Sequence, residues 1–212
     1  MTTVHYQGSL LDDPSPGGAT PGPLAGALRR THLRHGAWVD VLPGWLSGSD
    51  DVFVHLVGSV PWRAERRQMY ERMIDVPRLL SWYGEGDPLP HRALEQARDA
   101  LSGHYRPELG EPFRTAGLCY YRDGRDSVAW HGDTIGRSRT QDTMVAILSL
   151  GAARKLLLRP RSGGESIGFA LGHGDLLVMG GACQRTWEHA IPKTTQPVGP
   201  RISVQFRPRG VR

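Results

Sequence analysis

The stretch TMVAILSLGAARKLLLRP, residues 143–160, contains two short β-prone runs on either side of Gly151. The first run, residues 143–151, is apolar almost throughout, and the second, residues 154–160, sets three leucines between basic residues. Short apolar runs bounded by Gly or Pro are typical of strands in a protein core. The stretch therefore predicts two consecutive β-strands.

The same pattern continues through the rest of the chain after Pro112. Six further short runs are separated by Gly, Pro or Asp: FRTAGLCYY (113–121), DSVAWHGD (126–133), SIGFAL (166–171), DLLVMGG (175–181), TWEHAIP (186–192) and RISVQFRP (201–208). Seven or eight strands at such intervals predict an antiparallel sandwich or barrel.

The segment before Pro112 predicts helices. Residues 47–60 offer Ser49 as an N-cap, two acids in the first turn and apolar residues at helical spacing. Residues 90–105 place apolar side chains on one helical face and carry Gly103 near the end. We therefore expect a mainly β protein with flanking helices, of the α+β class.

The length of 212 residues allows one substantial core and is too short for two large domains. Residues 1–23 are rich in Gly, Pro, Ser and Thr, which predicts a flexible N-terminal tail. We expect a single domain over residues 24–212, with a helical part at 24–111 and the β-rich core at 112–208.

The composition is that of a globular protein, with 39% hydrophobic and 22% charged residues. No apolar run approaches the roughly 20 residues of a membrane span, and the N-terminus has no basic segment followed by an apolar one. Only two cysteines are present, which suits a reducing compartment. We expect a cytoplasmic protein that acts as a monomer and does not contact a membrane.

The net charge of +5 favours a polyanionic partner such as nucleic acid. Basic residues cluster at 63–78 and at 154–161, where they could hold phosphates. Nearly all of them are arginines, however, and such a bias can come from a GC-rich genome. Solvated basic faces therefore remain the alternative.

The tripeptide HGD occurs twice, at residues 131–133 and at residues 173–175. On a strand, residues i and i+2 project from the same face, so His131 and Asp133 can reach one metal ion. His189, on a later strand, is a candidate third ligand. Two histidines and one carboxylate leave open coordination positions, as in non-haem Fe(II) oxygenases.

The second copy has different surroundings. Gly174 and Asp175 stand directly before an unbroken apolar run, which is typical of a turn that enters a buried strand. We therefore expect His173 to be a turn residue and not a ligand.

The C-terminal run RISVQFRP adds two arginines to this set. Arg201 and Arg207 lie six residues apart, so a strand would place both on one face, where they could bind a small dicarboxylate. Arginines on an exposed strand face are the ordinary alternative. Together with the triad, they suggest an iron enzyme that binds 2-oxoglutarate.

At this point the chain resembles the AlkB family of iron- and 2-oxoglutarate-dependent dioxygenases over roughly residues 35–208. The family pattern is N-x-Y-x-x-G, H-x-D, a distant H and R-x-N-x-T-F-R, and this chain has CYYRDG, WHGD, WEHAIP and RISVQFR. The resemblance implies a double-stranded β-helix, or jelly roll. It also implies an Fe(II) site at His131, Asp133 and His189, and 2-oxoglutarate contacts from Tyr121, Arg201 and Arg207.

The resemblance extends upstream to VPRLLSWYGE, residues 76–85, which is similar to the segment that grips the target nucleotide. It would give Arg78, Trp82 and Tyr83 substrate roles, although the same residues could form a strand that packs on the core. A flipped base would stack between His131 and one of Tyr83, Trp82 or Trp62. Trp130 and Trp187 are expected to pack behind the site.

Four departures from the family pattern matter. Cys119 and Ser203 stand in place of two asparagines near the cosubstrate, so weaker donors must replace two amide hydrogen bonds. Ile135 stands where many members carry an acid linked to recognition of the damaged base. The tyrosine-rich stretch after YGD is missing. Recognition of the substrate is more affected than binding of iron and cosubstrate.

The family implies oxidative demethylation of N-alkylated nucleobases, such as 1-methyladenine and 3-methylcytosine, in DNA or RNA, as in repair of alkylation damage. An alternative is a dioxygenase of the same fold that hydroxylates a small molecule or a protein side chain, which Ile135 and the missing tyrosines favour. A third reading is a non-catalytic β-sandwich that binds nucleic acid through its arginines.

The N-terminal tail carries YQGSLLDD, which resembles the peptides that bacterial repair proteins present to the sliding clamp. Gln7, Ser9, Leu10 and Leu11 would be the contacts, and a tail with two leucines is the plain alternative. If the motif binds, Gln7→Ala and Leu10→Ala abolish pull-down by the clamp. Pull-down that persists in both variants would contradict the motif.

Overall fold

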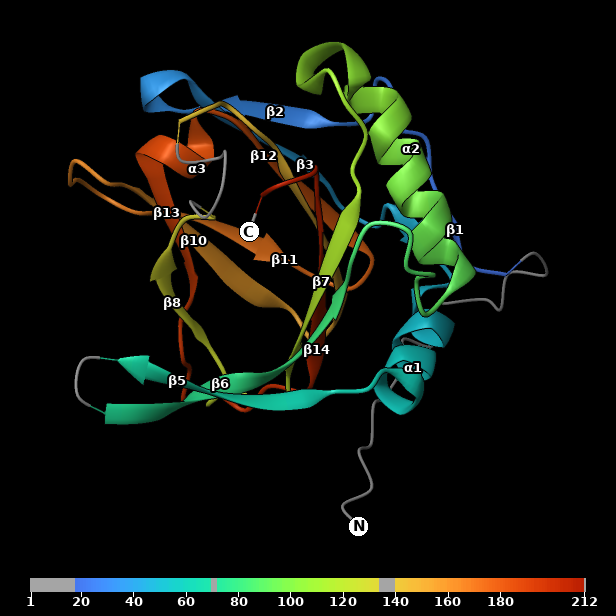
Figure 1. Ribbon diagram of the computed structural model, residues 1–212, viewed down its shortest axis with the longest axis vertical. Coiled ribbons are helices and arrows are strands. Elements are labelled where there is room, and N and C mark those ends of the chain that lie inside the picture. The colour runs from blue at the N-terminus through green and yellow to red at the C-terminus, as the bar shows by residue number, and fades with distance from the viewer. Residues whose placement is uncertain (1–17, 70–71, 134–139, 212) are drawn as a thin grey trace.

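The computed structural model describes residues 18–69, 72–133 and 140–211 (Figure 1). The helices are α1 (Ser49–Ser59), α2 (Arg92–Leu109) and α3 (Cys183–Thr186), with a 3-10 turn η1 (Arg34–Gly36). The strands before residue 112 are β1 (Thr20–Pro21), β2 (Arg29–His32), β3 (Ala37–Leu42), β4 (Leu46–Ser47), β5 (Arg63–Met69) and β6 (Arg72–Tyr83). The later strands are β7 (Thr115–Tyr121), β8 (Val128–His131), β9 (Val145–Gly151), β10 (Arg154–Pro160), β11 (Ile167–Leu171), β12 (Asp175–Gly181), β13 (Trp187–Ile191) and β14 (Arg201–Arg207).

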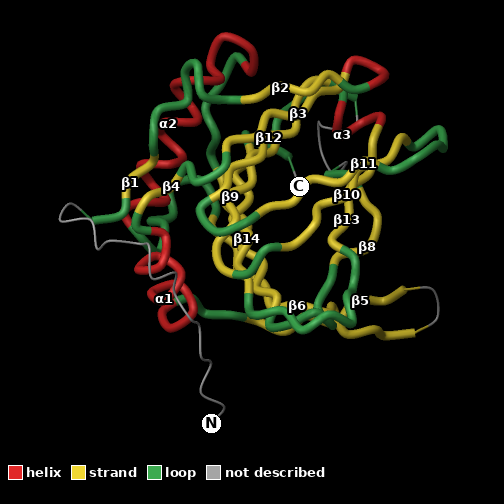
Figure 2. Tube along the Cα trace, turned by 180° about the vertical axis from the view of Figure 1, so that it is seen from behind, coloured by secondary structure: helices red, strands yellow, loops and turns green. Residues whose placement is uncertain are grey.

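Two antiparallel sheets face each other, as the strand pattern predicts, and form the jelly roll that the family resemblance implies. The larger sheet has eight strands in the order β2-β3-β12-β9-β14-β7-β6-β5, and the smaller has four in the order β11-β10-β13-β8. Figures 1 and 2 show α1 and α2 on the outer side of the larger sheet, opposite the smaller one. The expected fold class, mainly β with flanking helices, is confirmed.

The stretch 143–160 forms two strands as predicted, and each belongs to a different sheet. β9 lies in the larger sheet and β10 in the smaller, and Gly151 has a φ of 88° where the chain crosses between them. A Cβ at this position would stand 2.5 Å from the Pro200 carbonyl oxygen. Glycine is therefore required both by the backbone conformation and by the close approach.

The part before residue 112 differs from the expected helical segment, because β2, β3, β5 and β6 join the larger sheet. From the sequence, we expect a strand here only as the alternative for residues 76–85, which overlap β6. β2 and β5 consist largely of charged and polar residues, so no local pattern indicates them, and pairing within the sheet stabilises them. The folded part also starts before residue 24, since Thr20 and Pro21 pair with β4. α2 continues past Gly103 and ends at Leu109, with Gly110 as its C-cap at a φ of 77°.

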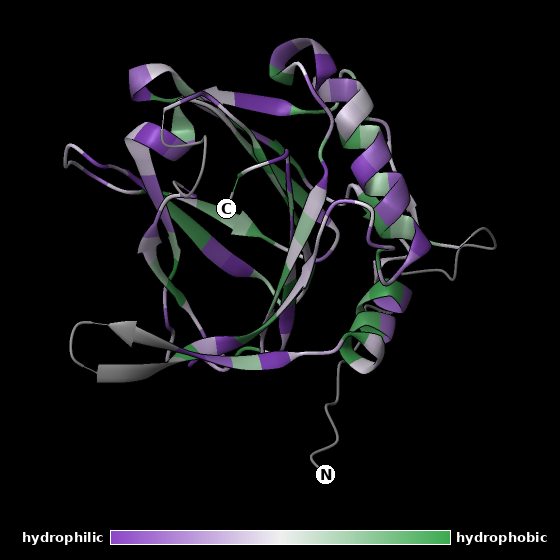
Figure 3. Ribbon diagram, viewed as in Figure 1, coloured by the Kyte–Doolittle hydropathy of each residue, from purple (hydrophilic) through white to green (hydrophobic). Residues whose placement is uncertain are grey.

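The larger sheet buries apolar residues on both of its faces. α1 and α2 pack on the outer face through residues such as Phe53, Leu56 and Leu101, and in Figure 3 α2 alternates between hydrophobic and hydrophilic segments. A second apolar cluster fills the space between the two sheets and includes Ile147 and Leu158. No helix in the described part of the chain is both long and apolar enough to cross a membrane.

A buried polar network attaches α2 to the edge of the larger sheet. The Asp40 carboxylate, 1% exposed, accepts hydrogen bonds from Arg30 Nε at 2.8 Å and from the Tyr105 hydroxyl at 2.9 Å. The Arg30 guanidinium lies 3.7 Å from the centre of the Trp38 ring and also pairs with Glu108. Burial raises the pKa of Tyr105, and the neighbouring carboxylate raises it further, so the hydroxyl stays a donor.

We expect Tyr105→Phe to lower the free energy of unfolding by about 2 kcal/mol, because it removes a hydrogen bond to a buried carboxylate. Urea denaturation measures the change. Glu108→Gln is the matched control, since it removes an exposed partner of the same network and should cost less than about 1 kcal/mol. A Tyr105→Phe variant no less stable than this control would contradict the account.

Candidate metal centre and cosubstrate pocket

The structure brings together the three side chains that the sequence suggests as metal ligands. His131 on β8 and His189 on β13 are directly paired across the smaller sheet, and Asp133 follows β8 by two residues. One ligand atom from each residue lies within 4.8 Å of the others. The two imidazole rings have centroids 4.2 Å apart. Two nitrogens and one oxygen at this spacing can hold one divalent metal ion.

Neighbouring groups fix the orientation of these side chains. His131 Nδ1 lies 2.9 Å from the Ala129 carbonyl oxygen. Because a carbonyl only accepts, Nδ1 carries the proton and Nε2 is left for a metal. Asp133 accepts a 2.7 Å hydrogen bond from Arg207 Nε, and its backbone N–H donates to Gln184 Oε1.

The charges of the ligands suit a cation. Burial alone would raise the pKa of Asp133, but the charge of Arg207 and the two imidazoles lower it to about 2. Burial, together with the neighbouring His131, lowers the pKa of His189 to about 3. Near neutral pH the site therefore holds an ionised carboxylate and a neutral His189 imidazole, the forms that bind metals.

Arg201 provides a buried cation that is not fully paired. Its side chain on β14 is 1% exposed, and Nε donates to Ser149 Oγ at 3.0 Å. Within the described part of the chain, neither Nη atom has a hydrogen-bond partner. The guanidinium lies 5.3 Å from the centre of the Tyr121 ring. A buried guanidinium with two unused donor groups fits a carboxylate ligand, because burying it unpaired is costly.

Arg207 contacts the metal cluster directly. It bonds the Asp133 carboxylate through Nε, and the resemblance implies that it also helps to hold the end of 2-oxoglutarate that Arg201 does not bind. A Cβ on Gly117 would stand 2.9 Å from Arg207 Nη1, so glycine leaves the room that this guanidinium needs. Arg207 therefore orients a ligand of the metal, in addition to any contact it makes with a cosubstrate.

The positions that depart from the family pattern contact one another. Gln205 Nε2 donates to Ser203 Oγ at 2.6 Å, and the Cys119 thiol lies 3.7 Å from Gln205 Oε1. These side chains share the inner face of the larger sheet, where Ser203 pairs with Cys119. Gln205 therefore supplies a side-chain amide where the family's two asparagines are missing. Since Ser203 Oγ accepts from Gln205, its own hydroxyl proton is available to a ligand.

The predicted substrate residues on β6 lie on two different faces of the larger sheet. Trp82 pairs with Gly117 and lies on the inner face, 44% exposed, with the Arg207 guanidinium 6.0 Å from its ring centre. Arg78 shares that face by strand alternation, and its Nη1 donates to the Ser127 carbonyl at 3.0 Å. Tyr83 instead packs on the apolar cluster beneath α1 and α2.

Trp62 also packs on that outer cluster, 5.2 Å from Tyr120 between ring centres. Of the three aromatic residues considered for stacking on a base, Trp82 is therefore the one on the inner face. Trp187 is buried between the sheets, as expected. Trp130 precedes His131 on β8, so strand alternation directs it to the opposite face of the smaller sheet, and it lines a groove.

His173 occupies the turn between β11 and β12, and its Nδ1 accepts the Gly151 N–H at 2.7 Å. It belongs to no metal-binding group among the described residues. Ile135 lies outside the described residues, as do Gln7, Ser9, Leu10 and Leu11 of the tail motif.

The basic cluster at 154–161 does not form one phosphate-binding surface. Arg154 is 5% exposed and donates to the carbonyl oxygens of Asp123, Asp126 and Pro192. Arg159 pairs with Glu188 at 2.9 Å.

Gln184 and Gln205 are the functional residues that the sequence did not reveal, because a buried glutamine has no local signature.

Comparisons with known proteins agree with this geometry. The family model described as the 2OG-Fe(II) oxygenase superfamily matches residues 83–207. Alpha-ketoglutarate-dependent dioxygenase alkB homolog 3 from Bos taurus is 32% identical over 200 residues, covering 81% of this chain and 68% of that protein. The human homolog 3 is 30% identical with the same coverage. The chain belongs to the AlkB family.

A more distant relative and a solved structure are also similar to this chain. The DNA oxidative demethylase ALKBH2 from Homo sapiens is 28% identical over 182 residues, covering 75% of this chain and 68% of that protein. The solved structure of OsALKBH1 superposes with a TM-score of 0.56 at 16% identity, covering 84% of this chain and all of that one. As an AlkB-family enzyme, the protein is a dioxygenase that uses Fe(II) and 2-oxoglutarate.

We expect Gln205→Leu to weaken 2-oxoglutarate binding about threefold to tenfold, because Ser203 then loses the donor that orients its hydroxyl. Anaerobic titration of 2-oxoglutarate into the Fe(II)-loaded protein, followed by its charge-transfer absorption, measures the affinity. Gln196→Leu, at an exposed glutamine on the segment before β14, is the matched control. Equal affinity in the two variants would show that Gln205 has no such role.

Proposed function

We propose that this protein is an oxidative demethylase of N-alkylated nucleobases, with 1-methyladenine and 3-methylcytosine as substrates in DNA or RNA. One observation carries the proposal: a His-Asp-His cluster lies in the interior of an AlkB-family jelly roll together with Arg201, whose two Nη atoms have no hydrogen-bond partner among the described residues. The relative ALKBH2 is by its name a DNA oxidative demethylase. This activity would serve repair of alkylation damage.

In the proposed site, His131, Asp133 and His189 would hold Fe(II), and three protein ligands would leave coordination positions for the cosubstrate. When bound, Fe(II) and 2-oxoglutarate supply the oxidation: O2 is consumed, 2-oxoglutarate leaves as succinate and CO2, and one oxygen atom enters a methyl C–H bond. A hydroxymethyl group on a ring nitrogen then breaks down to formaldehyde and the unmodified base.

The remaining residues bind and orient. Arg201 and Tyr121 would hold the distal carboxylate of 2-oxoglutarate, and Ser203 and Cys119 would line its path. Arg207 keeps Asp133 ionised and correctly turned. The apolar residues between the sheets exclude water, which strengthens every charge interaction in the pocket.

On the substrate side, Trp82 replaces Tyr83 and Trp62 as the aromatic that stacks on a flipped base, opposite His131. Arg78 would contact the nucleotide or its phosphate. The segment between Tyr83 and α2 carries no further aromatic residue, and this supports the alternative of a small-molecule or protein hydroxylase of the same fold.

Both cysteines are free, in keeping with the proposed cytoplasmic location.

The test is turnover of single-stranded oligonucleotides that carry 1-methyladenine or 3-methylcytosine, measured as succinate and formaldehyde in equal amounts. Unmethylated oligonucleotides are the substrate control. Succinate release that no methylated oligonucleotide stimulates would favour the alternative hydroxylase.

We expect His131→Ala and Asp133→Ala to abolish this turnover, whereas His173→Ala leaves it largely intact. The two HGD tripeptides make His173 the matched control, since its Nδ1 accepts the Gly151 N–H of β9 and its Nε2 lies 3.3 Å from Asp50 Oδ1 of α1. The reverse pattern of activity would show that the second copy carries the chemistry.

A further inference from the structure

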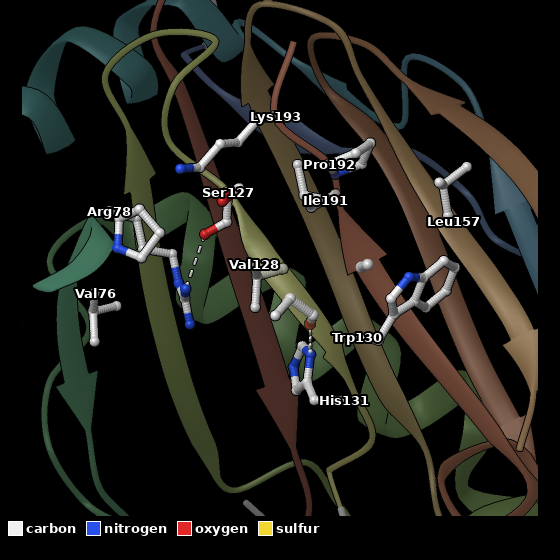
Figure 4. A pocket seen from close by; sticks show the side chains of 13 residues that line it. Val76, Arg78, Ser127, Val128, Trp130, His131, Leu157, Ile191, Pro192 and Lys193 are labelled. Atoms are coloured by element: carbon white, nitrogen blue, oxygen red, sulfur yellow. Dashed lines mark hydrogen bonds between the residues drawn. The ribbon is translucent and has the colours of Figure 1, made fainter. Parts of the chain in front are cut away.

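A groove with a volume of about 570 Å³ has His131 among its lining residues (Figure 4). It follows β8, the edge strand of the smaller sheet, and we call it the Trp130 groove. Its lining includes Arg78, Val128, Trp130, Leu157, Ile191 and Lys193. In Figure 4, Arg78 and Lys193 lie along one side, with Trp130 and Leu157 on the other.

Trp130 forms a rigid flat wall of this groove. The Arg159 guanidinium lies 4.3 Å from the centre of its ring. Arg159 is itself held by Glu188, which accepts from Nε at 3.1 Å and from Nη2 at 2.9 Å. A tryptophan held in this way loses little entropy when a second flat group stacks on it.

The opposite side of the groove is basic. Lys193 is exposed and has no acidic partner among the described residues. Arg78 directs Nη1 to the Ser127 carbonyl, while its buried Nε has no partner within the described part of the chain. None of the thirteen lining residues is acidic. An anionic ligand with one apolar flat face matches this lining.

A nucleotide combines these properties, since its base stacks and its phosphate pairs with cations. The volume lies within the range of sites for ligands of this size. We propose that the Trp130 groove binds the nucleotide next to the base being oxidised, with its base on Trp130 and its phosphate at Lys193. This inference rests on the proposed function, because His131 joins the groove to the metal centre.

The first experiment separates the groove from the reacting site. We expect Trp130→Leu to raise KM at least fivefold for a methylated trinucleotide and to leave KM for methylated adenosine monophosphate within twofold. Trp130→Phe should restore much of the loss because it keeps a stacking ring. The Fe(II)–2-oxoglutarate charge-transfer absorption confirms that each variant retains its metal centre.

Lysine substitutions provide a second, independent readout. Lys193→Gln should reduce the slope of log Kd against log salt by about 0.7 for a single-stranded oligonucleotide, the value for one phosphate contact. The chain has only two lysines, and Lys155, which does not line the groove, gives the matched control Lys155→Gln. The control slope should equal that of the wild type.

The outcomes distinguish this inference from the proposed demethylase function on which it rests. A wild type that forms the charge-transfer complex but neither binds nor demethylates any methylated oligonucleotide would refute both. Demethylation that Trp130→Leu slows equally for the trinucleotide and the mononucleotide, or a salt slope that Lys193→Gln does not change, would overturn the groove alone.

Discussion

The ion pair between Arg207 and Asp133 is the interaction on which the site depends, because it joins the two sheets of the jelly roll. Arg207 belongs to the eight-stranded sheet, and Asp133 directly follows β8 of the four-stranded one. Both side chains are largely buried, with 11% and 5% exposure. A buried carboxylate without a partner would take up a proton or destabilise the fold. Paired with Arg207, it stays ionised and can serve as a metal ligand.

The strand β14 serves two environments at once because successive side chains alternate. Ile202, Val204 and Phe206 pack into the cluster beneath α1 and α2. The intervening residues, Arg201, Ser203, Gln205 and Arg207, form a polar row on the inner face. This row extends from the Arg201 guanidinium to Arg207, which bonds the Asp133 carboxylate at the metal centre. The apolar side chains of β14 therefore fix the position of the polar side chains on its other face.

The same alternation divides β6 between support and function. Tyr83 contributes to the outer core, whereas Trp82, one residue before it, is exposed on the inner face beside Arg207. β6 also contacts the chain just before β8, where Pro77 accepts the Ser127 N–H at 2.8 Å. The strand that carries Arg78 and Trp82 is therefore held against the strand that carries His131. The backbone contact between Pro77 and Ser127 therefore positions the proposed substrate residues relative to the metal centre.

Period-two patterns and spacing within single strands were sufficient to predict much of this protein. All eight strands after Pro112 follow from short apolar runs, and the pairing of His131 with Asp133 follows from a separation of two residues. Strand alternation also places Arg201 and Arg207 on one face. Each of these inferences uses only local geometry.

What the tertiary structure alone decided involves partners far apart in the chain. Charged strands such as β5 exist because a neighbouring strand pairs with them, and no local pattern records this. Three further features depend on the register between strands. Arg207 bonds Asp133, and the Gln205 amide contacts both Cys119 and Ser203. Trp82, and not Tyr83, lies on the inner face. The sequence by itself determined which residues could share a face. Only the packing of the two sheets determined which atoms of those faces are in contact, because segments far apart in the sequence interact only once the whole domain has folded.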